Sequence, residues 1–268
     1  MTKSVRVVLV GWGAIGRTVG RLLTESDADV ELVGVAVRSS AAPREGMPSG
    51  TPLLTDPSEL TALAPDVVAE AAGRETVAPW GRAALGTGAD FIVSSVSAFA
   101  DAAVLAELRA IAVERNASIQ IQPGALAGVD ALAAAKVFGL DSVEHRIVKP
   151  PAAWRGTPAD EPGVLDGLVD PTVLLDATAA ETAARFPKNA NVAMTTALAG
   201  LGPERTRVVL VADPGATTNR HELRASGAFG ELDVRIDNAA LPDNPKSSAM
   251  AALGLARAIL NRATPLSI

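Results

Sequence analysis

The 268-residue chain contains no cysteine and no tyrosine, and it has only two histidines, His145 and His221. Without cysteine the chain can form no disulfide, no thiol nucleophile and no thiolate metal site. A side chain that exchanges protons near neutral pH is therefore one of the two histidines, or a lysine or carboxylate with a strongly shifted pKa. These absences leave few positions for a catalytic acid or base.

Long apolar runs and clusters of positive charge are missing as well. Hydrophobic residues make up 48% of the chain, but no segment approaches the roughly 18 uninterrupted apolar residues of a membrane span. The start of the chain lacks the basic-then-apolar plan of a secretory signal. A net charge of -6 with no lysine or arginine cluster argues against a nucleic-acid partner. We therefore expect a cytoplasmic protein that binds small molecules, with no membrane or nucleic-acid partner and no metal.

A glycine-rich motif stands at the start of the chain. The apolar residues 5–10 lead directly into Gly11, Gly13 and Gly16, and a segment with apolar residues at helical spacing follows. In such a strand–turn–helix, the first glycine permits a tight bend and the second lets a pyrophosphate approach the backbone. The third lets the helix pack closely on the strand. We predict a dinucleotide-binding turn in which these glycines and Ile15 bind the cofactor.

Strands and helices alternate over the first part of the chain. Strands are predicted at residues 5–10, 30–37, 65–73, 90–96 and 118–122. Helices are predicted after the first strand and at residues 76–88 and 101–116, the last with Asp101 as N-cap. This alternation predicts right-handed crossovers and a parallel sheet. The expected fold class is α/β, with a Rossmann-type doubly wound sheet over residues 1–122.

The pattern changes after residue 122. Helices are predicted at residues 124–138, 176–185 and 189–200, and strands at residues 142–148, 206–212, 220–226 and 231–237. The last three strands are expected to be consecutive in an antiparallel sheet. Residues 123–245 are thus predicted to form a smaller α+β catalytic domain with a mostly antiparallel sheet. The C-terminal residues 246–268, helical over 247–261, are predicted to pack back on the first domain.

The end of the second predicted strand bears on the choice of cofactor. NAD-specific sites usually place Asp or Glu there, to bind the ribose hydroxyls. This chain has Arg38 followed by two serines. Because a guanidinium can bind a 2′-phosphate, the cofactor is predicted to be NAD or NADP. The alternative is that Arg38 is a solvated loop residue.

Polar residues at the starts of predicted elements are the candidates in the second domain. Asn189 and Asn191 stand at a helix start. Asn189 is either a simple N-cap or functional, whereas the amide of Asn191, inside the first turn, could bind a nicotinamide carboxamide. His221 opens a strand after a turn-rich stretch and is the candidate catalytic residue. His145 shares a face with apolar residues of an alternating strand, which favours a packed sheet histidine.

Several cations of this domain suit an anionic substrate. Lys246 and Ser247 lie at the predicted N-terminus of the last helix, where backbone N–H groups favour anions. Lys188 immediately precedes another predicted helix, and Lys149 and Arg155 are further cations. We predict Lys188, Lys246 and Ser247 as substrate-binding residues. For Lys246, an ordinary surface lysine is the alternative.

The order of these motifs resembles the L-aspartate dehydrogenases. The resemblance rests on the glycine turn and on residues 123–132, 149–158, 186–192, 212–214, 219–221 and 244–248. It implies a Rossmann domain plus an α/β catalytic domain, usually in a homodimer. It also implies oxidation of L-aspartate with NAD or NADP to iminosuccinate, which can feed NAD synthesis or hydrolyse to oxaloacetate and ammonia. By position, His221 matches the catalytic histidine, and Ala125 and Asn191 match cofactor-contacting positions.

Two other functions fit the same scaffold. One is a related reductase or dehydrogenase for another small dicarboxylate or an imine, because residues 177–182 depart from the pattern of many relatives. The other is a non-catalytic nucleotide-binding sensor, since Rossmann scaffolds carry many functions. The presence of His221, Asn191 and Lys246 favours catalysis, because a sensor would not need the histidine.

Overall fold

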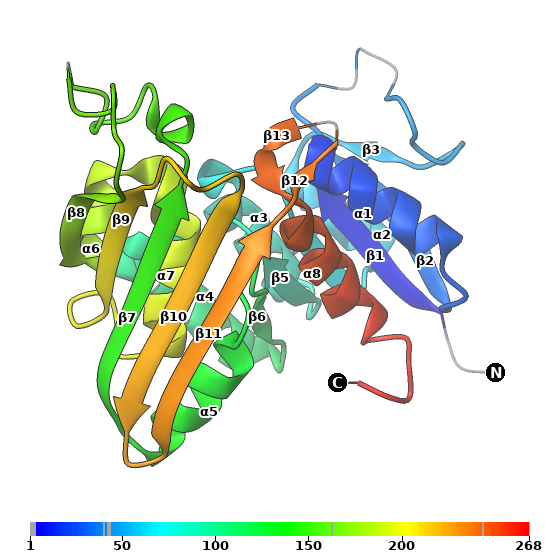
Figure 1. The fold of residues 1–268 in the computed structure, drawn as a ribbon. Coiled ribbons are helices and arrows are strands. Elements are labelled where there is room, and N and C mark those ends of the chain that lie inside the picture. The colour runs from blue at the N-terminus through cyan, green and yellow to red at the C-terminus, as the bar shows by residue number, and fades with distance from the viewer. Residues whose placement is uncertain (1–3, 40, 42–43, 162, 243, 268) are drawn as a thin grey trace. The chain divides into compact units, whose positions relative to one another are not determined.

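The computed structural model describes residues 4–39, 41, 44–161, 163–242 and 244–267, which fall into two compact units, each with its own sheet (Figure 1). The first unit comprises Met1–Gly124, Leu241–Ser247 and Ala251–Ile268. The second comprises Ala125–Ala240 and Ser248–Met250.

The sheet of the first unit has six parallel strands in the order β3-β2-β1-β4-β5-β6. This is the doubly wound order of dinucleotide-binding folds, so the α/β prediction is confirmed. The strands are β1 (Val5–Val10), β2 (Val30–Ala36), β3 (Leu53–Leu54), β4 (Val67–Glu70), β5 (Asp90–Val93) and β6 (Ile119–Ile121). Strand β3 has no counterpart among the predicted strands, because two residues leave no periodic pattern.

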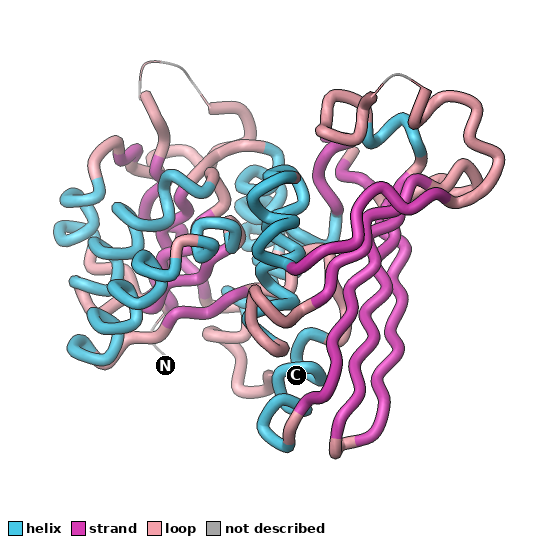
Figure 2. The backbone as a smooth tube through the Cα atoms, turned by 90° about the vertical axis from the view of Figure 1, so that its left-hand side faces the viewer, coloured by secondary structure: helices cyan, strands magenta, loops and turns pink. Residues whose placement is uncertain are grey.

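One helix of the first unit, α4 (Ala102–Arg115), begins and ends at recognisable capping residues. The Asp101 side chain accepts a hydrogen bond from the Ala103 amide, as predicted for an N-cap, and Asn116 closes the same helix in the left-handed conformation. The described helices are α1 (Ala14–Glu25), α2 (Leu60–Leu63), α3 (Arg74–Gly86), α4 (Ala102–Arg115) and most of α8 (Ala249–Leu260), with 3₁₀ turns η1 (Pro57–Glu59) and η2 (Val96–Ala100). Figure 2 shows these helices packed around the strands.

The second unit is built on a five-stranded mixed sheet in the order β11-β10-β7-β9-β8. Its pairs are antiparallel except β7–β9, which is parallel. The strands are β7 (Leu140–Lys149), β8 (Thr172–Thr178), β9 (Arg207–Ala212), β10 (Asn219–Gly227) and β11 (Gly230–Asn238). The prediction of a mostly antiparallel sheet is thus confirmed.

The structure corrects three details of the second unit. First, β9 is not the antiparallel neighbour of β10, because β7 lies between them. Second, residues 176–178 belong to β8, since the helix begins only after the capping box of Thr178 and Glu181. Third, the helix predicted from residue 124 begins at Val129, after Gly128 in the left-handed conformation. Helix and strand propensities alone predict neither the strand order nor these helix starts, because the order depends on strand pairing and the starts depend on caps.

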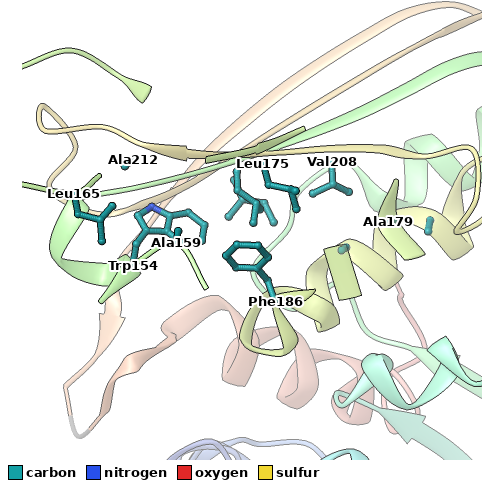
Figure 3. Close-up of a cluster of buried hydrophobic side chains, with 12 residues drawn as sticks. Trp154, Ala159, Leu165, Leu175, Ala179, Phe186, Val208 and Ala212 are labelled. Atoms are coloured by element: carbon teal, nitrogen blue, oxygen red, sulfur yellow. The ribbon is translucent and has the colours of Figure 1, made fainter. Parts of the chain in front are cut away.

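One face of this sheet is covered by α5 (Val129–Phe138), α6 (Ala179–Arg185) and α7 (Ala190–Ala199) (Figure 1). Figure 3 shows the core cluster between the strands and these helices. The rings of Trp154 and Phe186 meet edge to face there, with their centroids 6.2 Å apart. Trp154 is fully buried, belongs to the 3₁₀ turn η3 (Pro151–Trp154), and donates a hydrogen bond to the Val211 carbonyl at 3.0 Å. This anchor holds the chain where it leaves the end of β7.

Candidate active site

The glycine turn of the first unit has the geometry that a dinucleotide requires. Gly11 has φ +102°, and a Cβ there would lie 2.9 Å from backbone atoms of the neighbouring turn. A Cβ on Gly16 would lie 2.2 Å from the Gly11 carbonyl oxygen, whereas at Gly13 nothing lies within 4 Å. Helix α1 begins directly after Gly13, with Ile15 half-buried in its first turn. The turn therefore leaves open backbone, and N–H groups without helical partners, which is the arrangement that favours an anion such as a pyrophosphate.

A cleft of ≈ 440 Å³ lies at the carboxyl ends of β1 and β2 and is lined by this turn. Ligands of open α/β sheets bind at this edge. Exposed Arg38 lines the cleft, as does Arg44, whose Nη2 donates to the Ser39 carbonyl at 2.6 Å. The Nε of Arg44 is buried and has no hydrogen-bond partner among the described residues. Two guanidinium groups thus line the cleft, of which the sequence pattern indicated only Arg38.

The wall of the cleft beside the glycine turn is held by a buried carboxylate. Glu70, at the end of β4, is fully buried. Its Oε1 accepts from the amides of Ala72 and Gly73 at 2.7 and 2.8 Å, and its Oε2 accepts from the Ser95 amide at 2.8 Å. A buried carboxylate needs hydrogen-bond partners, and these three backbone N–H groups provide them. Glu70 thus keeps the residue 71–73 turn in the shape that borders the cleft.

In the second unit, β10 places His221 beside a second histidine. His221 faces Ile147 of β7, with only 6% of its surface exposed. Its Nδ1 lies 3.0 Å from Nε2 of His145, and Nδ1 of His145 lies 3.0 Å from the Thr196 hydroxyl of α7. His145 is fully buried, as predicted for a packed sheet histidine. Its contact with His221 could not be foreseen, because it depends on how β7 pairs with β10.

Both rings are neutral at physiological pH. Burial lowers the pKa of His145 from 6.5 to about 3. The pKa of His221 is well below 6.5, first because of burial and then because of nearby His145 and Lys149. A neutral imidazole has a ring nitrogen that can accept a proton, as a general base must.

Lys149 completes this group at the end of β7. Its Nζ donates to Oδ1 of Asn189 at 2.6 Å and lies 5.0 Å from the centre of the Trp154 ring. Burial, and then the positive charge of Lys188, lower the pKa of Lys149 to about 8. Asn189 is the N-cap residue of α7, but its side chain makes no cap hydrogen bond. Its amide oxygen accepts from Lys149 instead of capping the helix.

Three further predicted site residues lie in the second unit. Lys188 is exposed in the 3₁₀ turn η4 (Pro187–Asn189), and its charge acts on Lys149. Exposed Asn191 lies in the first turn of α7. The Ala125 carbonyl accepts from Asn238 Nδ2 at 2.9 Å. All three belong to the second unit, the unit of His221.

The predicted placement of Ser247 at a helix N-terminus is wrong. Ser247 lies in the short strand β13 (Asn244–Ser248), which pairs with β12 (Ala240–Leu241), and its hydroxyl accepts from Asn244 Nδ2 at 3.0 Å. The hydroxyl at the start of α8 is that of Ser248, which accepts from the Met250 amide. The helix starts later than predicted because this serine caps it. Lys246 also lies in β13, but its side chain is outside the described residues.

No helix in the described ranges is long and apolar enough to cross a membrane. No group of three or more histidine, aspartate or glutamate side chains in the described ranges is placed to hold a metal ion.

Two family models match the chain. "Aspartate dehydrogenase, C-terminal" matches residues 130–262, and "Homoserine dehydrogenase, NAD binding domain" matches residues 11–122. The chain is 51% identical to an L-aspartate dehydrogenase of Brucella anthropi, with 98% of each chain covered. It is 42% identical to an L-aspartate dehydrogenase of Ralstonia pickettii, with 98% of this chain and 100% of the relative covered.

Solved structures agree with these matches. The aspartate dehydrogenase of Thermotoga maritima superposes with a TM-score of 0.78 at 26% identity, covering 98% of this chain and 99% of that chain. A hyperthermophilic archaeal homoserine dehydrogenase in complex with NADPH shares the fold, with a TM-score of 0.62 at 14% identity over 96% and 97% of the two chains. The identity and coverage of these relatives, together with the matched C-terminal model, show that the chain belongs to the L-aspartate dehydrogenase family.

Proposed function

We propose that the chain is an NAD(P)-dependent dehydrogenase that oxidises L-aspartate to iminosuccinate. The observation that carries the proposal is a neutral, buried histidine, His221, grouped with a lysine and an asparagine in a chain that also has a dinucleotide-binding turn. Histidine accepts a proton, lysine attracts a carboxylate, and the turn holds the cofactor. A purified sample with NAD or NADP and a panel of L-amino acids, followed by absorbance of the reduced cofactor, tests it.

The histidine removes the proton that blocks oxidation. The ammonium group of aspartate must lose a proton before its Cα can release a hydride, because the nitrogen lone pair forms the new C=N bond. Neutral His221 accepts this proton and, because its pKa is low, passes it on readily. A nicotinamide held by the glycine turn would supply the hydride acceptor for Cα. For hydrolysis to oxaloacetate and ammonium, the same ring takes a proton from the attacking water.

Two lysines provide the charge for a dicarboxylate. Lys149 and Lys188 lie close enough for their charges to interact, and among the described residues neither has a carboxylate within ion-pair distance. An incoming dianion relieves this repulsion and gains charge-assisted hydrogen bonds. We therefore assign Lys149 to the side-chain carboxylate of the substrate and Lys188 to its α-carboxylate. Lys246 and Ser247 stay candidates from the sequence.

The remaining cofactor contacts are assigned by chemistry and position. The exposed amide of Asn191 can pair a donor and an acceptor with the nicotinamide carboxamide. Ala125 corresponds to a cofactor-contacting position in the family resemblance. Gly11, Gly13, Ile15 and Gly16 bind the pyrophosphate through the start of α1.

Binding of an unreactive dicarboxylate should weaken as the pH rises through about 8, where Lys149 loses its charge. Succinate suits this test because it lacks the amine that titrates in aspartate. His221 does not contribute, since its pKa lies well below this range. We expect the inhibition constant of succinate to be constant at lower pH and to rise above about pH 8.

The control for this pH profile is Lys149→Met, which keeps most of the length of the side chain without its charge. The variant should bind succinate more weakly and without the rise above about pH 8. The same profile in both proteins would show that another group titrates.

Replacing Arg38 with alanine should weaken NADP binding more than NAD binding, with both cofactors active in the wild type. A charge-assisted hydrogen bond contributes about 1.5–3 kcal/mol, or roughly tenfold or more in affinity. Fluorescence titration with NADPH and NADH measures both dissociation constants. Arg115→Ala, an exposed residue at the end of α4, removes the same charge outside the cleft and should leave both constants unchanged. If Arg38→Ala raises both dissociation constants by the same factor, Arg38 has no role at the 2′ position.

The homodimer, the cytoplasmic location and a supply of product to NAD synthesis remain proposals. The sheet face opposite α5, α6 and α7 supports a dimer, because no described helix of the second unit covers it (Figure 1). The strands also carry ion pairs such as Arg146 with Glu222. The mass in solution, by light scattering, tests this proposal.

A further inference from the structure

The hydrogen bonds behind His221 form a chain with a defined direction. The Thr196 hydroxyl lies 3.1 Å from the Val192 carbonyl and 3.0 Å from Nδ1 of His145. A carbonyl oxygen can only accept, and a hydroxyl has only one proton to donate. The alternative, in which this proton goes to His145, would leave the oxygens of Thr196 and Val192 in contact without a hydrogen between them. The hydroxyl therefore donates to Val192 and accepts from His145.

This direction determines the protonation of both rings. Since Nδ1 of His145 donates to Thr196, and His145 is neutral, its Nε2 carries no proton and must accept. Its partner at 3.0 Å is Nδ1 of His221, which therefore carries a proton. Because His221 is neutral too, its Nε2 has a free lone pair. Within the described part of the chain, this Nε2 has no hydrogen-bond partner.

We propose that Thr196 and His145 are positioning residues that hold His221 in the tautomer whose Nε2 is the free base. The proposal rests on the proposed function, because it assigns how the catalytic histidine of that reaction is prepared. His145 acts through His221 and Thr196 acts through His145. All three side chains are largely or fully buried, so water does not compete for these hydrogen bonds.

A neutral partner has a different effect from a carboxylate. An aspartate behind a histidine stabilises the imidazolium that forms, as in the serine protease triad. His145 carries no charge and is far from gaining one, because burial lowers its pKa to about 3. It therefore orients and selects the tautomer of His221 without making the ring a strong base.

The test uses Thr196→Val and Thr196→Ser in the full chain. Valine keeps the shape of threonine but cannot accept from His145, so His145 should move its proton to Nε2 and donate to His221. His221 would then carry its own proton on Nε2 and lose its base. The loss of one buried hydrogen bond changes the ratio of the two His221 tautomers by about 10- to 100-fold. We expect kcat for L-aspartate to fall by the same factor. The KM and the cofactor dissociation constant should change little. Thr196→Ser keeps the hydroxyl and should retain kcat.

A spectroscopic measurement separates this proposal from the proposed function. Long-range ¹H–¹⁵N correlation spectra identify the tautomer of each histidine, and a tag-free sample has only two histidines to assign. We expect both rings with the proton on Nδ1 in the wild type and in Thr196→Ser, and both with the proton on Nε2 in Thr196→Val. This readout needs neither substrate nor turnover.

Two results would overturn the proposal. One is a wild-type spectrum in which His221 carries its proton on Nε2, and this decides the matter even if Thr196→Val does not fold. The other is a Thr196→Val protein that has switched tautomer but keeps the wild-type kcat. If the spectra show the expected tautomers but the protein oxidises no amino acid, the proposed function fails and the tautomer assignment is unaffected.

Discussion

Replacing His221 with alanine should lower kcat for L-aspartate by about 10²- to 10⁴-fold, the usual contribution of a general base. The chain has no tyrosine or cysteine that could take over, and its other histidine has a pKa of about 3. Cofactor binding should persist, because the dinucleotide-binding turn belongs to the other unit. Steady-state kinetics and titration with the reduced cofactor measure the two effects. Unchanged turnover would exclude His221 as the base.

The matched control for this experiment is His221→Asn. Alanine leaves Nε2 of His145 without its donor, and an unpaired buried polar group costs about 1–3 kcal/mol of stability. Asparagine places an amide N–H near the position of Nδ1 but has nothing in place of Nε2. Both variants should lose kcat alike, whereas His221→Asn should unfold at a higher temperature than His221→Ala. A loss of activity confined to the alanine variant would indicate a structural role.

The first unit follows from local sequence patterns to a large extent. The apolar run before Gly11, the bend and close contact at Gly11 and Gly16, and the cap at Asp101 are interactions between near neighbours in the chain. Such interactions leave a signal in a short window of sequence. Strand β3 does not, since it is held in the sheet by β2 rather than by a pattern of its own.

The active site of the second unit depends on contacts that no short window contains. Val143, His145 and Ile147 alternate as any half-buried strand does, which explains why the sequence indicated only a packed His145. The antiparallel register of β7 and β10 brings this ring to His221, 76 residues away. Lys149 likewise meets Asn189 across 40 residues. The residue types of the site could be predicted, but their partners required the strand pairing.

The preference for L-aspartate over L-alanine and L-asparagine should be large, up to about 10⁴-fold in kcat/KM. A site built around a polar substrate group rejects analogues that lack it by about that factor. Here the group is the side-chain carboxylate, and its proposed partner is Lys149, held by Asn189 in partly buried surroundings. L-asparagine has nearly the same shape but no charge, so its binding leaves the ammonium uncompensated. Steady-state kinetics with the three amino acids measures the ratio.

Lys149→Met tests whether this lysine causes the preference. The variant should lose most of its kcat/KM for L-aspartate while its low values for L-alanine and L-asparagine change little, because only the dianion uses the charge. Lys136→Met, an exposed lysine of α5 outside the group, is the matched control and should keep the wild-type ratio. If wild-type kcat/KM is similar for L-alanine and L-aspartate, the substrate assignment fails. The alternative of a related dehydrogenase with a different substrate then follows, because the dinucleotide turn and His221 serve any amine oxidation, whereas the charge at Lys149 serves only an acidic side chain.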